Sequence, residues 1–165
     1  MLTMGIDIGS RSSKCVILED GKLLTYGTIE TGPNIHKTAQ AVVEAAIHRR
    51  AGKWGDYRMP LPETKADHLK IEDMAYVVAT GYGRAIVPFA HRHVTEITCH
   101  CRGAQWFVPG DLLLCGGVVR NAGIVKAIEA HLGKPALVPK QPQYVRALGA
   151  AVFARQMERE GGASC

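Results

Sequence analysis

The sequence lacks the features that mark secreted, membrane-spanning or disulfide-stabilised proteins. No apolar run approaches the roughly 18 residues that a membrane-spanning helix needs, and no charged start leads into a long apolar stretch as in a secretory signal. Its 5 cysteines are an odd number without the spacing of a disulfide scaffold. These absences argue against secretion and membrane insertion, and they predict a reducing, cytoplasmic location.

Long basic runs are missing as well. The 20 Lys and Arg residues exceed the 15 Asp and Glu residues, which gives a net charge of +5. The basic residues are spread along the chain and do not alternate with aromatic ones, as they do in single-stranded nucleic-acid platforms. We therefore expect no nucleic-acid partner, since a small molecule that carries phosphate explains the mild basic excess equally well.

Familiar catalytic and nucleotide-binding signatures are also absent: G-x-x-x-x-G-K-[ST], G-x-G-x-x-G and any arguable Ser-His-Asp or Cys-His set. Residues 4–14 read M-G-I-D-I-G-S-R-S-S-K instead, an apolar strand that carries Asp7 into a turn of small hydroxyl residues. A second apolar run follows at 15–18, and Asp20-Gly21 predicts the next hairpin turn.

The turn at the tip of this hairpin is a candidate phosphate site. Backbone N–H groups, hydroxyls and one ammonium group would surround the phosphate, from Gly9, Ser10, Ser12, Ser13 and Lys14. Asp7 would hold a hydrated Mg²⁺ beside it, since this ion prefers oxygen ligands and keeps most of its waters. A plain edge hairpin is the alternative, but an acid between two isoleucines is costly unless something pairs with it.

Periodicity and turn residues predict an α/β layered domain. We expect strands within 3–18, 22–29, 75–80, 111–115 and 135–139, helices over 35–50, 94–107, 121–132 and 145–158, a surface loop over 53–70, and a frayed end over 160–165. The small residues of the last helix, Ala-Leu-Gly-Ala-Ala, favour close packing. A second glycine turn, Gly116-Gly117, lies before Asn121, which would cap a helix. This glycine pair is consistent with a simple strand-to-helix turn. It is also consistent with a backbone that lies flat against an adenine or ribose.

Several motifs together resemble one protein family. They are G-I-D-I-G-S-R-S-S-K, A-T-G-Y-G-R, E-I-T-C-H-C-R-G-A, C-G-G-V-V-R-N-A-G-I and Q-Y-V-R-A-L-G-A-A-V-F-A. In this order they resemble the ATP-dependent activators of 2-hydroxyacyl-CoA dehydratases and the ATPase subunits of benzoyl-CoA reductases, over residues 3–107 and 111–156.

The resemblance implies the ribonuclease-H-like ATPase fold of actin, sugar kinases and heat-shock chaperones. One full lobe would cover residues 1–107, a partial second lobe 111–158, and a disordered tail 159–165. It also implies that ATP hydrolysis drives a low-potential electron from an iron–sulfur cluster to a reductase or dehydratase partner, with a homodimer or heterodimer as the assembly.

The resemblance assigns roles to individual residues. Asp7 is expected near Mg²⁺ as the catalytic acid that places metal and water, and a cleft loop is expected at Thr80, Gly81 and Arg84. Phosphate contacts are expected from Ser10, Arg11, Ser12, Ser13 and Lys14. Nucleoside contacts are expected from Gly116, Gly117 and Asn121.

One family segment is missing between Phe107 and Asp111. It normally carries a second phosphate loop of D-I-G-G-Q type and the two cysteines that share a [4Fe–4S] cluster across a dimer, and neither motif is present here. Cys99 and Cys101 are the remaining candidate ligands, although residues two apart on a helix point in different directions. Three functions stay open: an electron-transferring ATPase, a shortened nucleotide-binding or interaction module without redox chemistry, and a small kinase for which no catalytic acid can be named.

Overall fold

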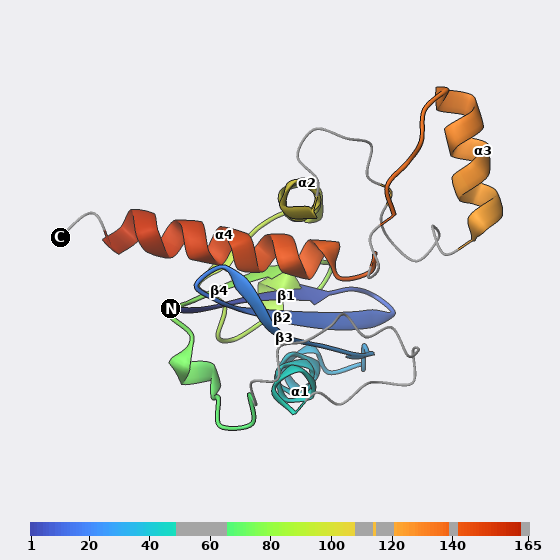
Figure 1. Ribbon diagram of the computed structural model, residues 1–165. Coiled ribbons are helices and arrows are strands. Elements are labelled where there is room, and N and C mark those ends of the chain that lie inside the picture. Colours follow the sequence, from blue (N-terminus) through green and yellow to red (C-terminus); the bar gives the residue numbers. More distant parts are fainter. Residues whose placement is uncertain (49–65, 108–113, 115–120, 139–141, 163–165) are drawn as a thin grey trace.

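A five-stranded mixed sheet forms the centre of the protein (Figure 1). The computed structural model describes residues 1–48, 66–107, 114, 121–138 and 142–162. The strand order is β3-β2-β1-β4-β5, with β1–β2 and β2–β3 antiparallel and β1–β4 and β4–β5 parallel. The strands are β1 (Leu2–Ile8), β2 (Ser12–Glu19), β3 (Lys22–Glu30), β4 (Tyr76–Thr80) and β5 (Arg92–His93).

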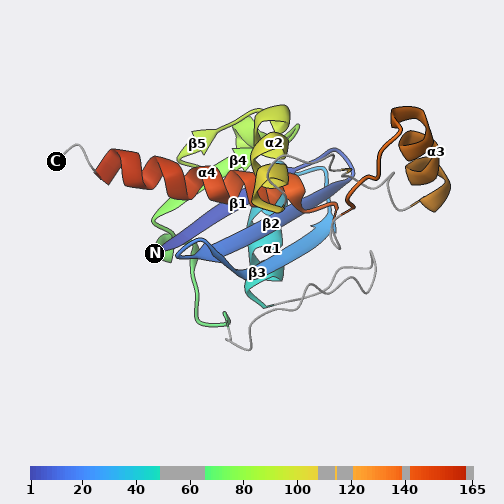
Figure 2. The same ribbon diagram turned by 45° about the horizontal axis from the view of Figure 1, so that its top comes forward.

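Helices cover both faces of this sheet. They are α1 (Ile35–Ile47), α2 (Glu96–Phe107), α3 (Ala122–Leu132) and α4 (Val145–Gly162), with short 3₁₀ turns at Ile71–Asp73 and Arg84–Ile86. Figure 1 shows α1 on one face and α4 on the other, with α2 packed on α4, and Figure 2 shows α4 crossing the strands. Within the described ranges, no helix combines the length and the apolar character needed to cross a bilayer.

The alternation of side chains along β1 makes the two faces different. Met4, Ile6 and Ile8 are fully buried in the apolar cluster that β1 shares with α1. On the other face, a Cβ added at Gly5 would overlap the backbone of Ala147 and Ala151. The backbone of α4 therefore lies directly on β1, which only glycine permits at this position.

The packing of α2 on α4 follows the same principle. A Cβ at Gly103 in α2 would overlap the carbonyl of Val145, and one at Gly149 in α4 would overlap the carbonyl of Cys99. The close packing predicted for the small residues of α4 is confirmed. The backbone of α4 is therefore in direct contact with the backbones of β1 and α2, the elements around Asp7.

Several predicted boundaries differ from the structure. The helix predicted over 35–50 ends at Ile47, with His48 as its C-cap. The two-residue strand β5 was not predicted, and the helix after it begins at Glu96, two residues later than expected. The helix predicted over 145–158 continues to Gly162, so residues 159–162 are helical where a disordered tail was expected.

The second half of the chain is described in part. The strand predicted over 111–115 and the lobe boundary near 108–110 lie largely outside the described residues. In place of a strand at 135–139, residues 135–138 contain one isolated bridge at Leu137, whose carbonyl accepts a hydrogen bond from the amide of Leu114 (2.9 Å). The helix after Asn121 is confirmed through Leu132, and Gly133 ends it in the left-handed conformation at φ 67°.

Candidate functional site

Three polar side chains form a row across the sheet where β1 ends. In the strand register Asp7 stands opposite Lys14 of β2 and opposite Thr80 of β4. Side chains at paired positions share a face, and Gly5 shows that this is the face beneath α4. The side chains of Asp7 and Thr80 are fully buried, and that of Lys14 nearly so. The hairpin thus brings the predicted acid and the predicted ammonium group together.

Asp7 is held among cations without a hydrogen bond. Its Oδ2 lies 3.2 Å from Nε of Arg146 and 3.9 Å from Nζ of Lys14, and among the described residues neither carboxylate oxygen accepts a hydrogen bond. Burial raises the pKa of Asp7, and the charges of Arg146 and Lys14 oppose this shift without cancelling it. A buried carboxylate with unused oxygens is a group that a bound cation or its waters would stabilise.

The turn after β1 presents backbone and hydroxyl groups. Ser10 and Arg11 are exposed at its tip, and Nζ of Lys14 donates to the carbonyl of Ser12 (3.0 Å). Burial lowers the pKa of Lys14, and the nearby charge of Asp7 opposes that shift. The ammonium group therefore faces the inner side of the turn, where a bound anion would stabilise its charge.

Thr31, which the sequence did not single out, braces this turn from behind. Its hydroxyl donates to the carbonyl of Gly9 (2.7 Å) and pairs with the hydroxyl of Ser13 (2.8 Å). Ser13 precedes Lys14 in β2, so its side chain points to the opposite face of the sheet. The Ser13 hydroxyl, which we expected at the phosphate, instead helps to fix the turn.

The loop after β4 closes the same end of the site. Gly81 has φ +89°, and an added Cβ would overlap the carbonyl of Ile8 and lie 2.5 Å from Oδ1 of Asp7. The amide of Gly83 donates to the same Ile8 carbonyl (3.0 Å), and Nη1 of Arg84 donates to the carbonyl of Gly81 (2.9 Å). The loop predicted in this cleft therefore lies against Asp7, with Arg84 holding its conformation.

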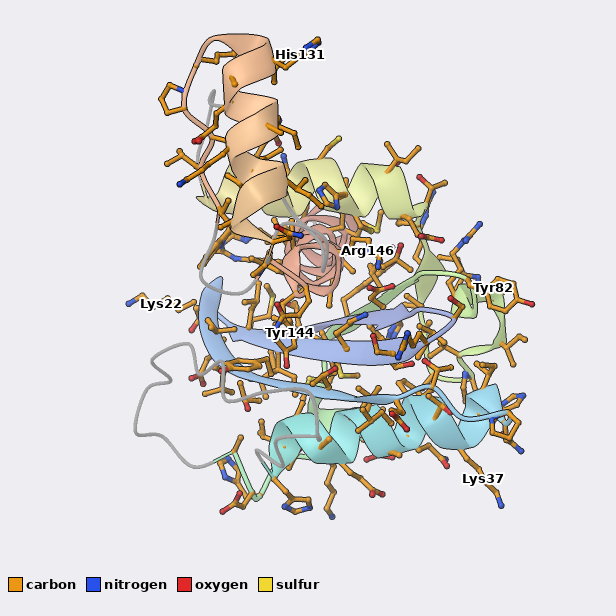
Figure 3. The ribbon with its side chains drawn as sticks, turned by 90° about the vertical axis from the view of Figure 1, so that its right-hand side faces the viewer. Lys22, Lys37, Tyr82, His131, Tyr144 and Arg146 are labelled. Atoms are coloured by element: carbon orange, nitrogen blue, oxygen red, sulfur yellow. The ribbon has the colours of Figure 1, made fainter. Side chains whose placement is uncertain are left out.

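Sequence reasoning missed Arg146 and Glu96. Arg146 follows the first residue of α4, and its Nη1 donates to Oε2 of Glu96 at the start of α2 (2.9 Å). Figure 3 views α4 end-on, with Arg146 close to the sheet and α2 on the far side of the helix. The one signal in the sequence was indirect: Asp7 needed a partner, and the sequence did not say which.

The predicted nucleoside residues are placed only in part. Gly116 and Gly117 lie outside the described residues. Asn121 caps α3, where its Oδ1 accepts a hydrogen bond from the amide of Gly123 (2.9 Å). Figures 1 and 2 show α3 standing beyond the end of the sheet at which β1 turns into β2. A nucleoside contact of Asn121 stays a prediction.

The candidate metal ligands of α2 do not share a direction. Cys99 is fully buried on the side that faces α4, whereas Cys101 is exposed. Burial raises the pKa of the Cys99 thiol to about 11, which disfavours the thiolate that a metal requires. In the part of the chain that the structure describes, no three His, Cys, Asp or Glu residues group as a metal site. These residues do not fit a [4Fe–4S] cluster.

The sequence model of the BadF/BadG/BcrA/BcrD ATPase family matches residues 4–112. The chain belongs to this family. Two curated relatives are the activator of lactoyl-CoA dehydratase from Anaerotignum propionicum, 38% identical over 109 residues, and the (R)-2-hydroxyglutaryl-CoA dehydratase activating ATPase from Acidaminococcus fermentans, 36% identical over 114 residues. These matches cover 66% and 65% of this chain but 36% and 35% of the relatives, so the matched segment spans about a third of their length.

A solved member shows the fold. The activator of 2-hydroxyisocaproyl-CoA dehydratase from Clostridium difficile, solved with bound ADPNP, superposes with a TM-score of 0.81 at 20% sequence identity. The superposition covers 100% of this chain and 98% of that one. The BadF/BadG/BcrA/BcrD chain described here therefore has the actin-like ATPase fold that its N-terminal hairpin predicted.

Proposed function

We propose that this chain is an ATP-binding activator subunit that serves an acyl-CoA dehydratase or reductase partner. The observation that carries the proposal is the row of Lys14 and Asp7 at the end of β1, beside a turn of small polar residues. The N–H groups of residues 9–12 and the Lys14 ammonium would bind the phosphates. Family membership and the relatives that activate hydroxyacyl-CoA dehydratases support the choice of nucleotide and partner.

Asp7 would hold Mg²⁺ through its waters. Its oxygens are buried and accept no hydrogen bond among the described residues, so a hydrated cation that displaced Arg146 from Oδ2 would donate hydrogen bonds to them through its waters. When bound, Mg²⁺ would neutralise charge on the nucleotide phosphates. The chain's own contribution is to orient those phosphates with Lys14 and to position water with Asp7, as the catalytic acid predicted above.

Substitution of Lys14 by alanine tests the phosphate site. The loss of a charged hydrogen bond of about 1.5–3 kcal/mol predicts that ATP binding weakens by at least about tenfold. Isothermal titration with Mg-ATP gives the affinity. Lys22→Ala is a matched control, since Lys22 begins β3, away from the β1–β2 turn (Figure 3). Equal affinities for the Lys14→Ala variant and wild type would remove this residue from the site.

The absence of the family's cluster-binding cysteine motif from this sequence favours a second function. The cysteine motif of the family is absent from the sequence, and Cys99 and Cys101 diverge. Such a chain would be a nucleotide-binding interaction module without electron transfer. Anaerobic purification separates the two functions: a brown protein with iron–sulfur absorbance overturns the module, whereas a colourless protein that still binds ATP overturns the electron-transferring subunit.

A further inference from the structure

Arg146 lies against the carboxylate of Asp7, beside which we expect a divalent cation. Its Nε lies 3.2 Å from Oδ2, the same oxygen that Lys14 approaches to 3.9 Å. A hydrated Mg²⁺ would have to bring its waters to this carboxylate, because Asp7 is the buried acid of the site. A guanidinium group and a hydrated metal therefore compete for one carboxylate.

Arg146 also has a second anionic partner. While Nε faces Asp7, Nη1 donates to Oε2 of Glu96 at 2.9 Å. The side chains of Arg146 and Glu96 are 33% and 41% exposed, so both reach solvent, whereas Asp7 does not. The guanidinium thus bridges a buried acid and a solvated one, and it could keep the Glu96 pair if a metal took over Asp7.

We infer that Arg146 supplies at Asp7 the positive charge that a divalent cation would otherwise supply, so that nucleotide binds this chain with little dependence on Mg²⁺. The inference rests on the proposed function, because it requires that phosphates bind beside Lys14. Two effects act in the same direction. Arg146 adds a cation near the phosphates when no metal is present, and it repels a metal that approaches Asp7. Arg146 is accordingly a positioning and specificity residue.

The test compares ADP binding in excess Mg²⁺ and in EDTA, measured by isothermal titration on the full chain. For wild type we expect the two dissociation constants to agree within about tenfold. For Arg146→Gln we expect their ratio to grow by about tenfold or more, the loss that one charged contact brings. Arg155→Gln is the matched control, since it removes the same charge from the same helix, where Arg155 lies against Gly21. It should keep the wild-type ratio.

Two further measurements make the inference independent of one variant. Glu96→Gln removes the solvated partner of Arg146 and leaves its contact with Asp7, so metal-free ADP should bind severalfold more tightly. Mg²⁺ alone should raise the unfolding temperature of Arg146→Gln and leave that of wild type unchanged. If Glu96→Gln weakened metal-free binding, or Mg²⁺ stabilised wild type as much as Arg146→Gln, Arg146 would not stand in for a metal.

The outcomes separate this inference from the proposed function. Folded wild-type protein that binds ADP neither with Mg²⁺ nor without it would overturn the proposed function, and the inference with it. If wild-type protein instead bound ADP with the same Mg²⁺ dependence as Arg146→Gln, the role of Arg146 would be overturned and the proposed function would stand.

Discussion

The two faces of the sheet are built on different principles. Beneath β1, the face toward α1 is filled with large apolar side chains, among them Met4, Ile6 and Ile8. The face toward α4 has glycine backbone contacts at Gly5 and a buried charged group at Asp7. Both faces bury apolar clusters, with Val16, Leu18 and Leu148 among them on the α4 face, but the α4 face also brings a helix close enough to pair with a buried carboxylate.

Gly5→Ala should produce the largest loss of stability, because it breaks the α4 face. Its Cβ would overlap backbone of Ala147 and Ala151, which cannot rotate away as a side chain can. We expect a cost of about 3 kcal/mol or more, at or beyond the upper end of usual overpacking costs. Ile6→Val on the α1 face should cost only about 0.5–1.5 kcal/mol. Urea unfolding gives both values, and equal costs would contradict the distinction between the faces.

Asp7→Asn should produce a smaller, pH-dependent effect. Because burial raises the pKa of Asp7, the stability linked to this group is fully present below its unfolded value of about 3.8. That stability is lost as pH rises through the folded pKa. The free energy of unfolding of wild type relative to Asp7→Asn should therefore fall with rising pH, by about 1.4 kcal/mol per unit of pKa shift.

The measurement for Asp7 is a series of urea unfolding curves from acid to neutral pH. Glu44→Gln, which removes a carboxylate from an exposed position on α1, is the matched control. A difference between wild type and Asp7→Asn that rose with pH would mean that the cations outweigh burial at this carboxylate.

The smallest effect concerns thiol reactivity on α2 and does not change the fold. Cys99 faces α4 with its pKa raised to about 11, whereas Cys101 is exposed. An alkylating reagent at neutral pH should therefore modify Cys101 in native protein and modify Cys99 only after unfolding. Peptide mapping by mass spectrometry distinguishes the two sites. Equal native labelling would mean that α2 does not present these faces.

Local signals in the sequence predicted local structure well. Asp20-Gly21 and the apolar runs before it predicted the hairpins, and Asn121 predicted the start of α3. These signals work because a turn or cap is decided by its own few residues. The turn between β1 and β2 was predicted for the same reason, although alternation along β2 places Ser13 on the other face.

Contacts between distant segments were not predictable. Arg146 lies in a segment that was predicted to be a closely packed helix because of its small residues. Nothing near Arg146 in the sequence indicates that it pairs with Asp7 and Glu96. Strand β5 has two residues, too few for any alternating pattern. Its pairing with β4 follows from tertiary position, which a single sequence does not encode locally.

The contact between β1 and α4 has a consequence for biosynthesis. Asp7 and Arg146 stand near opposite ends of the described chain, and β1 has no helix on its second face until α4 arrives. On the ribosome the β1–β2 hairpin emerges before α4, with its carboxylate still in water and the α4 face of β1 uncovered. The site is thus completed only once α4 has been synthesised, and a nascent chain arrested before α4 would hold Asp7 and the β1–β2 turn without Arg146.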